Sequence, residues 1–255
     1  MTTRAIFVTG AASGIGLATA VRFAREGWFV GLFDRDETHL ADAARACGER
    51  TIAGKLDVTN EREFARAVDD FARASGDRMD VLFNSAGILR MGRFEDVSLD
   101  DARLQLEVNV MGTVIGIRAA LPLLERTGNA AIVNMSSASA VYGAPELAVY
   151  SASKFAVRAL TEALDIELRK RGVRVCDVMP GYVDTPMVSS QSYRAKSIGT
   201  LGISLTADDI ADVVWEAAHG DRVHWIPQRN VALLSRLGGL IPELGRRVMR
   251  RYARM

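Results

Sequence analysis

The sequence predicts a single α/β domain in which a doubly wound parallel sheet of about seven strands is covered by helices on both faces. Two observations lead to this prediction. Short apolar runs rich in Val, Ile and Phe alternate with longer amphipathic stretches along the 255 residues, which is typical of βαβ units. A glycine-rich turn directly follows the first apolar run, and no repeat, low-complexity segment or linker divides residues 1–230. A C-terminal extension over residues 231–255 is expected to follow this domain.

Each expected strand is a short run of mostly apolar residues, and the expected helices fill the amphipathic stretches between the strands. Strands are expected at 4–9 (RAIFVT), 28–33 (WFVGLF), 51–56, 80–83 (DVLF), 130–135 (AAIVNM), 173–178 (VRVCDV) and 223–226 (VHWI). Helices are expected at 14–26, 36–47, 60–75, 100–127, 149–171 and 206–219. In doubly wound sheets, ligands bind beyond the carboxyl ends of the strands, so functional residues should lie in the segments that follow the strands.

The composition is that of a globular protein, with 49% hydrophobic residues, 25% charged residues and a net charge of +1. No uncharged apolar run approaches the ~18 residues of a membrane span, and residues 1–10 lack the features of a secretory signal. We therefore expect a soluble, cytoplasmic protein. The body of the chain has no long basic run, so nucleic-acid binding is not predicted. Cys47 and Cys176 lie far apart and in no metal-ligand spacing, so we expect packing roles and no metal site.

The glycine-rich turn after the first strand reads TGAASGIG and leads into the first helix. Glycines let the backbone turn tightly and approach a pyrophosphate, whose charge the N-terminus of the helix then stabilises. We expect the dinucleotide pyrophosphate of a Rossmann-type domain to bind at Gly10, Ser13, Gly14, Ile15 and Gly16. The alternative is a purely structural turn.

An acidic residue follows at the end of the second strand, where Asp34 stands eighteen residues beyond Gly16. This is near the ~20-residue offset of the acid that binds the adenosine ribose in Rossmann domains. The alternative is a helix cap for the stretch that follows. A carboxylate there would repel a 2′-phosphate, so the sequence favours NAD as cofactor. Arg35 keeps NADP as the alternative, because a guanidinium could pair with that phosphate.

The segment YSASK places Tyr150 and Lys154 four residues apart, one turn of a helix. The pair is either two surface residues without a role in function or an acid/base in which the lysine shifts the pKa of the tyrosine. In the second case the nearby ammonium favours the phenolate, and so lowers the pKa of the phenol from its usual value of about 10.

Several motifs occur together and in order: TGAASGIG, LDVT at 56–59, NSAG at 84–87, NV at 109–110, YSASK, and PGYVDTP at 180–186. With them, the chain resembles the short-chain dehydrogenase/reductase family from residue 4 to about residue 227. The resemblance implies that Tyr150 is the acid/base of the reaction, and that Lys154 tunes it and binds the nicotinamide ribose. It also implies that Ser137 orients the substrate oxygen and that Asn109 anchors a proton-relay water.

The resemblance assigns further residues to the cofactor, with contacts to adenine, to the dinucleotide after the fourth strand and to the nicotinamide. These residues are Asp57, Val58, Asn84, Ala86, Gly87, Pro180, Gly181, Val183 and Thr185. Two alternatives remain open. Asp57 is also placed to cap the helix that follows it, and Asn84 could instead stabilise the central strands.

The Tyr-x-x-x-Lys spacing implies carbon–oxygen rather than carbon–carbon redox chemistry, with a secondary alcohol or ketone as substrate. Residues 186–205 match the family's substrate lid, and their apolar members favour a lipophilic substrate. The alternative is that these side chains pack on the body of the protein. A rival function is a non-catalytic dinucleotide sensor, which would need the glycine turn and Asp34 but not Tyr150.

The C-terminal extension carries six arginines against a single acid, Glu243. Apolar residues recur beside the arginines at helical spacing, namely Leu234, Leu237, Ile241, Leu244 and Val248. Two short helices are expected, which pack on the protein or on a dimer mate, or else contact an anionic membrane surface as in a peripheral membrane dehydrogenase. The apolar helices at 100–127 and 149–171 predict a homodimer or homotetramer.

Overall fold

The computed structural model describes residues 3–238, 247 and 250–251 and contains the expected sheet. Seven parallel strands run in the order β3-β2-β1-β4-β5-β6-β9. Their bounds are β1 (Ala5–Thr9), β2 (Phe29–Asp34), β3 (Thr51–Lys55), β4 (Val81–Asn84), β5 (Ala130–Met135), β6 (Val173–Val178) and β9 (His224–Trp225). All seven strands predicted from the sequence are confirmed, and so is the doubly wound topology.

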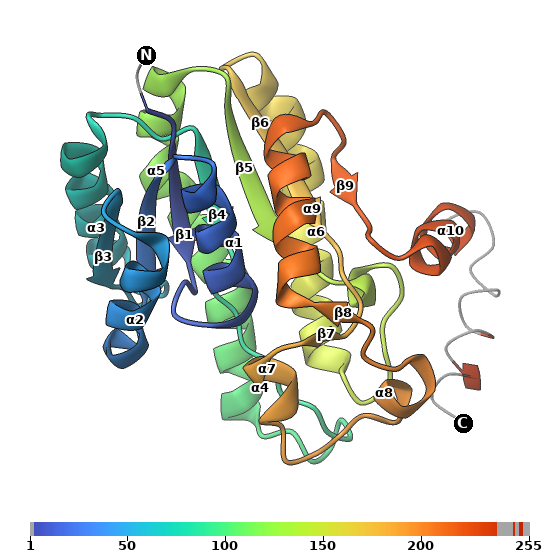
Figure 1. The fold of residues 1–255 in the computed structure, drawn as a ribbon. Coiled ribbons are helices and arrows are strands. Elements are labelled where there is room, and N and C mark those ends of the chain that lie inside the picture. The colour runs from blue at the N-terminus through green and yellow to red at the C-terminus, as the bar shows by residue number, and fades with distance from the viewer. Residues whose placement is uncertain (1–2, 239–246, 248–249, 252–255) are drawn as a thin grey trace.

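Helices cover both faces of the sheet (Figure 1). On one face lie α1 (Gly14–Arg25), α2 (Glu37–Cys47) and α9 (Ala207–His219), and on the other α3 (Glu61–Ser75), α5 (Gly112–Thr127) and α6 (Ala148–Arg169). The first layer packs through a core that includes Phe23 of α1 and Val214 of α9. The second packs through Phe64, Phe71 and Leu124, with the ring of Phe64 stacked on Phe7 at 5.7 Å. The amphipathic stretches therefore bury their apolar faces as predicted.

The long helix expected over 100–127 is interrupted. It consists of α4 (Leu99–Leu106), a π-helical turn (Glu107–Met111) and α5. A π turn inserts an extra residue into the helical ladder and is often found at functional sites. Here Asn109 lies at its centre, and its buried side chain hydrogen-bonds to the loop after β4 rather than within the helix. Hydrophobic periodicity does not reveal such an insertion, because the apolar pattern continues through it.

The helical run Leu99–Thr127 is long and apolar enough, by length and composition alone, to cross a membrane. Core helices pass the same test. The buried side chains of α5, among them Ile115, Leu123 and Leu124, pack against the sheet in the core described above. This packing explains the apolar character of the run.

Several short elements beyond β6 were not predicted. The two-residue strands β7 (Val183–Asp184) and β8 (Leu205–Thr206) pair with each other and frame α7 (Pro186–Ser189) and α8 (Lys196–Leu201). We call residues 186–205 the lid segment. Elements of two to six residues are too short to carry a periodic pattern, which is why the sequence did not predict them.

The chain continues from β9 into α10 (Arg229–Gly238), so one helix of the C-terminal extension begins within residues 1–230. Most of the extension, including the second expected helix, lies outside the described residues. The side chains of the predicted apolar stripe also lie outside them. Arg247, Arg250 and Arg251 are exposed.

Candidate active site

A cavity of about 660 Å³ lies beyond the carboxyl ends of the central strands. Residues that follow β1 and β4 line it, and these neighbouring strands mark the point where the strand order reverses and doubly wound sheets bind their ligands. All but one of the residues that the sequence assigned to the cofactor line this cavity, and the exception is Asn84. Those lining it are Gly10, Ser13, Gly14, Ile15, Gly16, Asp34, Arg35, Asp57, Val58, Ala86, Gly87, Tyr150, Lys154, Pro180, Gly181, Val183 and Thr185.

The glycine turn forms a backbone cradle that side chains would fill. Gly10 has a positive φ of 69°, and a Cβ at this position would lie 2.9 Å from the backbone of Ala86. A Cβ at Gly16 would overlap the carbonyl oxygen of Gly10. The helix that follows has no side-chain cap from Ser13 and no acidic residue in its first turn, so its N–H groups are left for an anion. The cradle therefore fits the pyrophosphate of a dinucleotide.

Asp34 ends β2 beside this cradle. Its carboxylate accepts one hydrogen bond from the Ala12 amide at 3.0 Å and another from the Asp36 amide at 3.0 Å. The cap of α2 is Asp36, which accepts from the amides of Thr38 and His39, so the alternative that Asp34 caps this helix is wrong. Asp34 and the exposed Arg35 both line the cavity, where an adenosine ribose would lie in a Rossmann-type domain.

The structure corrects the assignment of Asn84. This side chain is buried and donates from Nδ2 to Asn134 Oδ1 at 2.9 Å, and Asn134 in turn donates to Thr161 at 3.0 Å. The chain of amides ties β4 to β5 and α6 and leaves the Asn84 side chain outside the cavity. Asn84 therefore stabilises the central strands, which is the alternative that the sequence left open for this residue. Asp57 differs, because Asn60 caps α3 while Asp57 faces the cavity.

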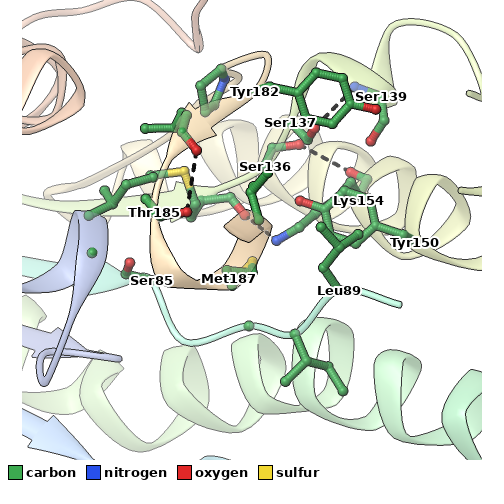
Figure 2. A pocket seen from close by; sticks show the side chains of 18 of the residues that line it. Ser85, Leu89, Ser136, Ser137, Ser139, Tyr150, Lys154, Tyr182, Thr185 and Met187 are labelled. Atoms are coloured by element: carbon green, nitrogen blue, oxygen red, sulfur yellow. Dashed lines mark hydrogen bonds between the residues drawn. The ribbon is translucent and has the colours of Figure 1, made fainter. Parts of the chain in front are cut away.

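Three of the predicted catalytic residues meet in the cavity (Figure 2). Ser137 follows β5, where the Ser139 amide donates to its Oγ at 3.1 Å. Tyr150 lies in the first turn of α6 and hydrogen-bonds to Ser137. Lys154 lies one turn further along α6, and its Nζ donates to the carbonyl of Met135 at 2.8 Å. The end of β5 and the start of α6 therefore bring together a hydroxyl, a phenol and an ammonium group.

Burial dominates the electrostatics of this group. It raises the pKa of Tyr150 to about 12. The hydrogen bond from Ser137 acts in the opposite direction, because it favours the phenolate and so lowers that pKa. Burial also lowers the pKa of Lys154 to about 8. The expectation that Lys154 brings the pKa of the phenol below its usual value is therefore not met within the protein alone. Its ammonium lies 5.6 Å from the centre of the Tyr150 ring and is itself removed from water.

Asn109 does not line the cavity. Its Oδ1 accepts from the Ile88 amide at 2.8 Å, and its Nδ2 donates to the Ile88 carbonyl at 3.0 Å and to Ser153 Oγ at 3.1 Å. Both ends of the side-chain amide are thus used by the loop after β4 and by α6. These bonds position the two segments, which carry Gly87 and Lys154. The relay role expected of Asn109 stays a prediction.

Several cavity residues were missed by the sequence analysis. Gln228 accepts from the Gly181 amide at 2.8 Å and so fixes the loop that holds Val183 and Thr185. Other missed residues on the substrate side are Leu89, Tyr142, Leu147, Tyr182, Asn230, Val231 and Leu233. The motif at 180–186 could have pointed to Tyr182, whereas the residues after β9 reach the cavity only through the tertiary fold. Within the described part of the chain, the charged residues that line the cavity are Asp34, Arg35, Asp57 and Lys154.

Comparisons with known proteins agree with this geometry. Residues 4–196 match the family model described as short chain dehydrogenase. A 1-deoxy-11-beta-hydroxypentalenate dehydrogenase of Streptomyces exfoliatus is 40% identical over 228 residues, covering 87% of this chain and 82% of that protein. A cyclopentanol dehydrogenase of Comamonas sp. (strain NCIMB 9872) is 40% identical over 200 residues, covering 75% and 80%. The crystal structure of a short chain dehydrogenase/reductase from Burkholderia phymatum in complex with NAD matches with a TM-score of 0.85 at 29% identity, covering 95% of each chain.

Proposed function

The chain belongs to the short-chain dehydrogenase/reductase family, and on this premise we propose that it oxidises an uncharged, lipophilic secondary alcohol to its ketone with NAD, or catalyses the reverse reaction. One observation carries the proposal. The group of Ser137, Tyr150 and Lys154 opens into the same cavity as the glycine cradle. A dinucleotide sensor would need the cradle alone, so the assembled acid/base group favours an enzyme.

Each residue of the site has its own role in the reaction. A nicotinamide dinucleotide held by the cradle, Asp34 and the 180–185 loop supplies the hydride acceptor and, when oxidised, a positive charge that favours the phenolate. Tyr150 takes the hydroxyl proton of the alcohol during oxidation and returns it to the ketone oxygen during reduction. With substrate bound, the Ser137 hydroxyl would turn its single proton from Tyr150 to that same oxygen. Lys154, held by the Met135 carbonyl, keeps an ammonium group within 5.6 Å of the centre of the Tyr150 ring.

The charge distribution supports NAD over NADP. The carboxylate of Asp34 is fixed by two backbone amides at the end of β2, so it cannot easily turn away from a 2′-phosphate. Arg35 is exposed beside it, and no hydrogen bond with another described residue holds its long side chain in place. The NAD bound by the Burkholderia phymatum protein is consistent with this preference.

The substrate side of the cavity supports an uncharged, apolar substrate. Among the residues that the structure describes, the charged ones lining the cavity lie on the dinucleotide side, apart from Lys154, which lies beside Tyr150. The remaining walls are formed by residues such as Leu89, Leu147, Met187 and Val188, with the hydroxyl groups of Tyr142 and Tyr182. The names of the two relatives, a cyclopentanol dehydrogenase and a hydroxypentalenate dehydrogenase, suggest alicyclic secondary alcohols as the first to test.

We also propose that the protein is a homo-oligomer. The α6 side chains of Phe155 and Ile166 are 40% and 79% exposed. They lie eleven residues apart, about three helical turns, and so share one face. Two exposed apolar side chains on one helix face are suited to contact with a second copy of the chain.

The experiment that tests the proposed reaction follows the absorbance of NADH while the purified protein meets NAD and a panel of alcohols. The panel contains cyclopentanol, larger alicyclic secondary alcohols and carboxylated analogues of the same size. We expect NADH to form with the neutral alcohols and more slowly with the carboxylated ones. Faster turnover of the carboxylated analogues would contradict the proposed substrate class.

A further inference from the structure

Glu146 adopts an unusual backbone conformation four residues before Tyr150. Its φ is +66°, in the left-handed region that residues with a Cβ rarely adopt. The other described non-glycine residues with positive φ are Asp77 and Asn129, whose short polar side chains tolerate it better. Such a conformation persists only where the surrounding structure fixes it. The contacts of the Glu146 side chain show what fixes it here.

The carboxylate of Glu146 is buried, with 4% of the side chain exposed, and it faces the lid segment. Its Oε1 accepts from the Tyr193 hydroxyl at 2.8 Å, and its Oε2 accepts from the Lys196 amide at 2.7 Å. The Lys196 ammonium lies 4.0 Å from Oε1. A buried carboxylate is tolerated when it is paired and hydrogen-bonded, and both conditions are met by residues of the lid segment.

The backbone of Glu146 makes a second connection. Its carbonyl accepts from the Gly92 amide at 3.0 Å, in the loop that follows β4. One residue thus joins three segments that each contribute lining residues to the cavity, namely this loop, the loop before α6 and the lid segment. The start of α6 also carries Tyr150, so the lid segment is fixed relative to the acid/base.

An apolar cluster lies beside these contacts and packs the lid segment against the same two loops. Its buried members are Leu89, Met91, Ala144, Leu147, Val188, Ala195 and Ile198, and Tyr150, Tyr182 and Tyr193 pack against it. A further hydrogen bond joins the Tyr182 hydroxyl to Ser197 Oγ at 2.7 Å. That contact is between neutral groups, whereas the hydrogen bonds to the Glu146 carboxylate are charge-assisted and stronger.

We propose that Glu146 is a positioning residue that latches the lid segment over the substrate part of the cavity. Substrate entry and product release then require the hydrogen bonds from Tyr193 and Lys196 to break and re-form. Only the identity of what the lid encloses rests on the proposed function. The latch itself rests on the contacts described above.

The test measures amide hydrogen exchange across residues 190–201 in the wild-type protein, Glu146→Gly and Glu146→Gln, with neither substrate nor cofactor added. Glycine accepts the positive φ, so Glu146→Gly should fold with an unfolding temperature no lower than that of the wild type. Exchange in the lid segment should be about tenfold faster or more, because two charge-assisted hydrogen bonds are lost. Glu146→Gln keeps an acceptor and should fall between the two. Glu95→Gln, an exposed carboxylate on the neighbouring loop, should match the wild type.

Kinetics with any alcohol that the wild type oxidises add a second readout. The latch predicts a KM several-fold higher in Glu146→Gly, with NADH affinity unchanged and KM partly restored in Glu146→Gln. Lid exchange equal to wild type in Glu146→Gly would overturn the proposal. So would faster exchange throughout the chain with a lower unfolding temperature, because it would assign Glu146 a general structural role. Since exchange is measured without substrate, a failed substrate assignment would leave this result intact.

Discussion

The ammonium nitrogen of Lys154 lies 5.6 Å from the centre of the Tyr150 ring, one turn along the same helix, and donates to the Met135 carbonyl at 2.8 Å. The spacing predicted from YSASK is therefore realised, but its electrostatic effect differs from the expected one. Both groups are desolvated, so each shifts toward its neutral form, the phenol to a higher pKa and the ammonium to a lower pKa. The site holds a buried cation at a cost in stability.

Lys154→Met should stabilise the protein while abolishing turnover. Lowering the pKa of Lys154 from 10.5 to about 8 corresponds to a penalty on the order of 3 kcal/mol. The substitution also leaves the Met135 carbonyl without its hydrogen-bond donor, and this cost offsets about 1–2 kcal/mol of the gain in stability. A net increase of about 1–2 kcal/mol in the free energy of unfolding is expected at pH 7, measured by urea denaturation without cofactor.

The pH dependence of this increase in the free energy of unfolding tests whether desolvation of Lys154 is its cause. Below pH 8 the folded chain carries a buried ammonium that the unfolded chain solvates, so the penalty is fully present. Between pH 8 and 10.5 the unfolded chain keeps a proton that the folded chain has lost, so wild-type stability rises with pH and the advantage of Lys154→Met fades. An advantage that stays constant over this range would mean that packing, not desolvation, is responsible.

Ser137→Ala should shift the pH profile as well as slow the reaction. The hydrogen bond from Ser137 lowers the pKa of Tyr150, so its loss raises that pKa. Alcohol oxidation needs the deprotonated phenol, so kcat/KM, which reports the ionisations of the free enzyme, rises with pH, and this rise should move to higher pH in the variant. The rate itself should fall by about 10²-fold or more.

Ser136→Ala is the matched control for this experiment, because the Ser136 hydroxyl donates to the Lys154 carbonyl and not to Tyr150. Its profile should stay at the wild-type position. If both variants shifted equally, the effect could not be assigned to the Ser137 hydrogen bond.

Asp34→Asn should weaken the preference for NADH. The asparagine keeps an acceptor for the Ala12 amide but loses the charge that repels a 2′-phosphate. By calorimetric titration we expect the Kd for NADH to rise about tenfold and that for NADPH to fall. Asp42→Asn removes the same charge from the exposed surface of α2 and should change neither. A wild-type protein that bound NADPH more tightly than NADH would refute the assigned preference.

Ile166→Glu should disrupt self-association. Its side chain is 79% exposed on the face that it shares with Phe155, and a charge there would have to be buried in a contact between two copies. Light scattering should report two or four chains of 27.7 kDa for the wild type and a smaller assembly for the variant. Phe94→Glu, at 73% exposure on a loop, is the control expected to assemble normally. A monomeric wild type would remove the basis for this prediction.

The sequence predicted the parts of the site that depend on local patterns. The glycine cradle and the Tyr150–Lys154 pair each lie within a few residues, at spacings set by a turn or a helix. The strands were predictable because runs such as AAIVNM are buried on both faces. These patterns were enough to place the cavity at the carboxyl ends of the strands.

The parts that could not be predicted depend on partners distant in the chain. The Asn84 side chain hydrogen-bonds to Asn134, and the Asn109 side chain hydrogen-bonds to the backbone of Ile88, so neither side chain lines the cavity. Gln228 reaches Gly181 only because β9 completes the sheet next to β6. The raised pKa of Tyr150 likewise depends on burial by the whole fold, which the spacing of two residues does not reveal.

The acid/base role of Tyr150 is tested by comparing Tyr150→Phe with the wild type in two assays on the same preparation. One follows NADH formation from NAD and the best alcohol substrate, and the other follows NADH binding by titration. Turnover should fall by about 10³-fold or more while the Kd for NADH changes less than threefold, because only the proton-transfer group is removed. Turnover that survives in Tyr150→Phe would contradict the role assigned to this residue and the mechanism built on it.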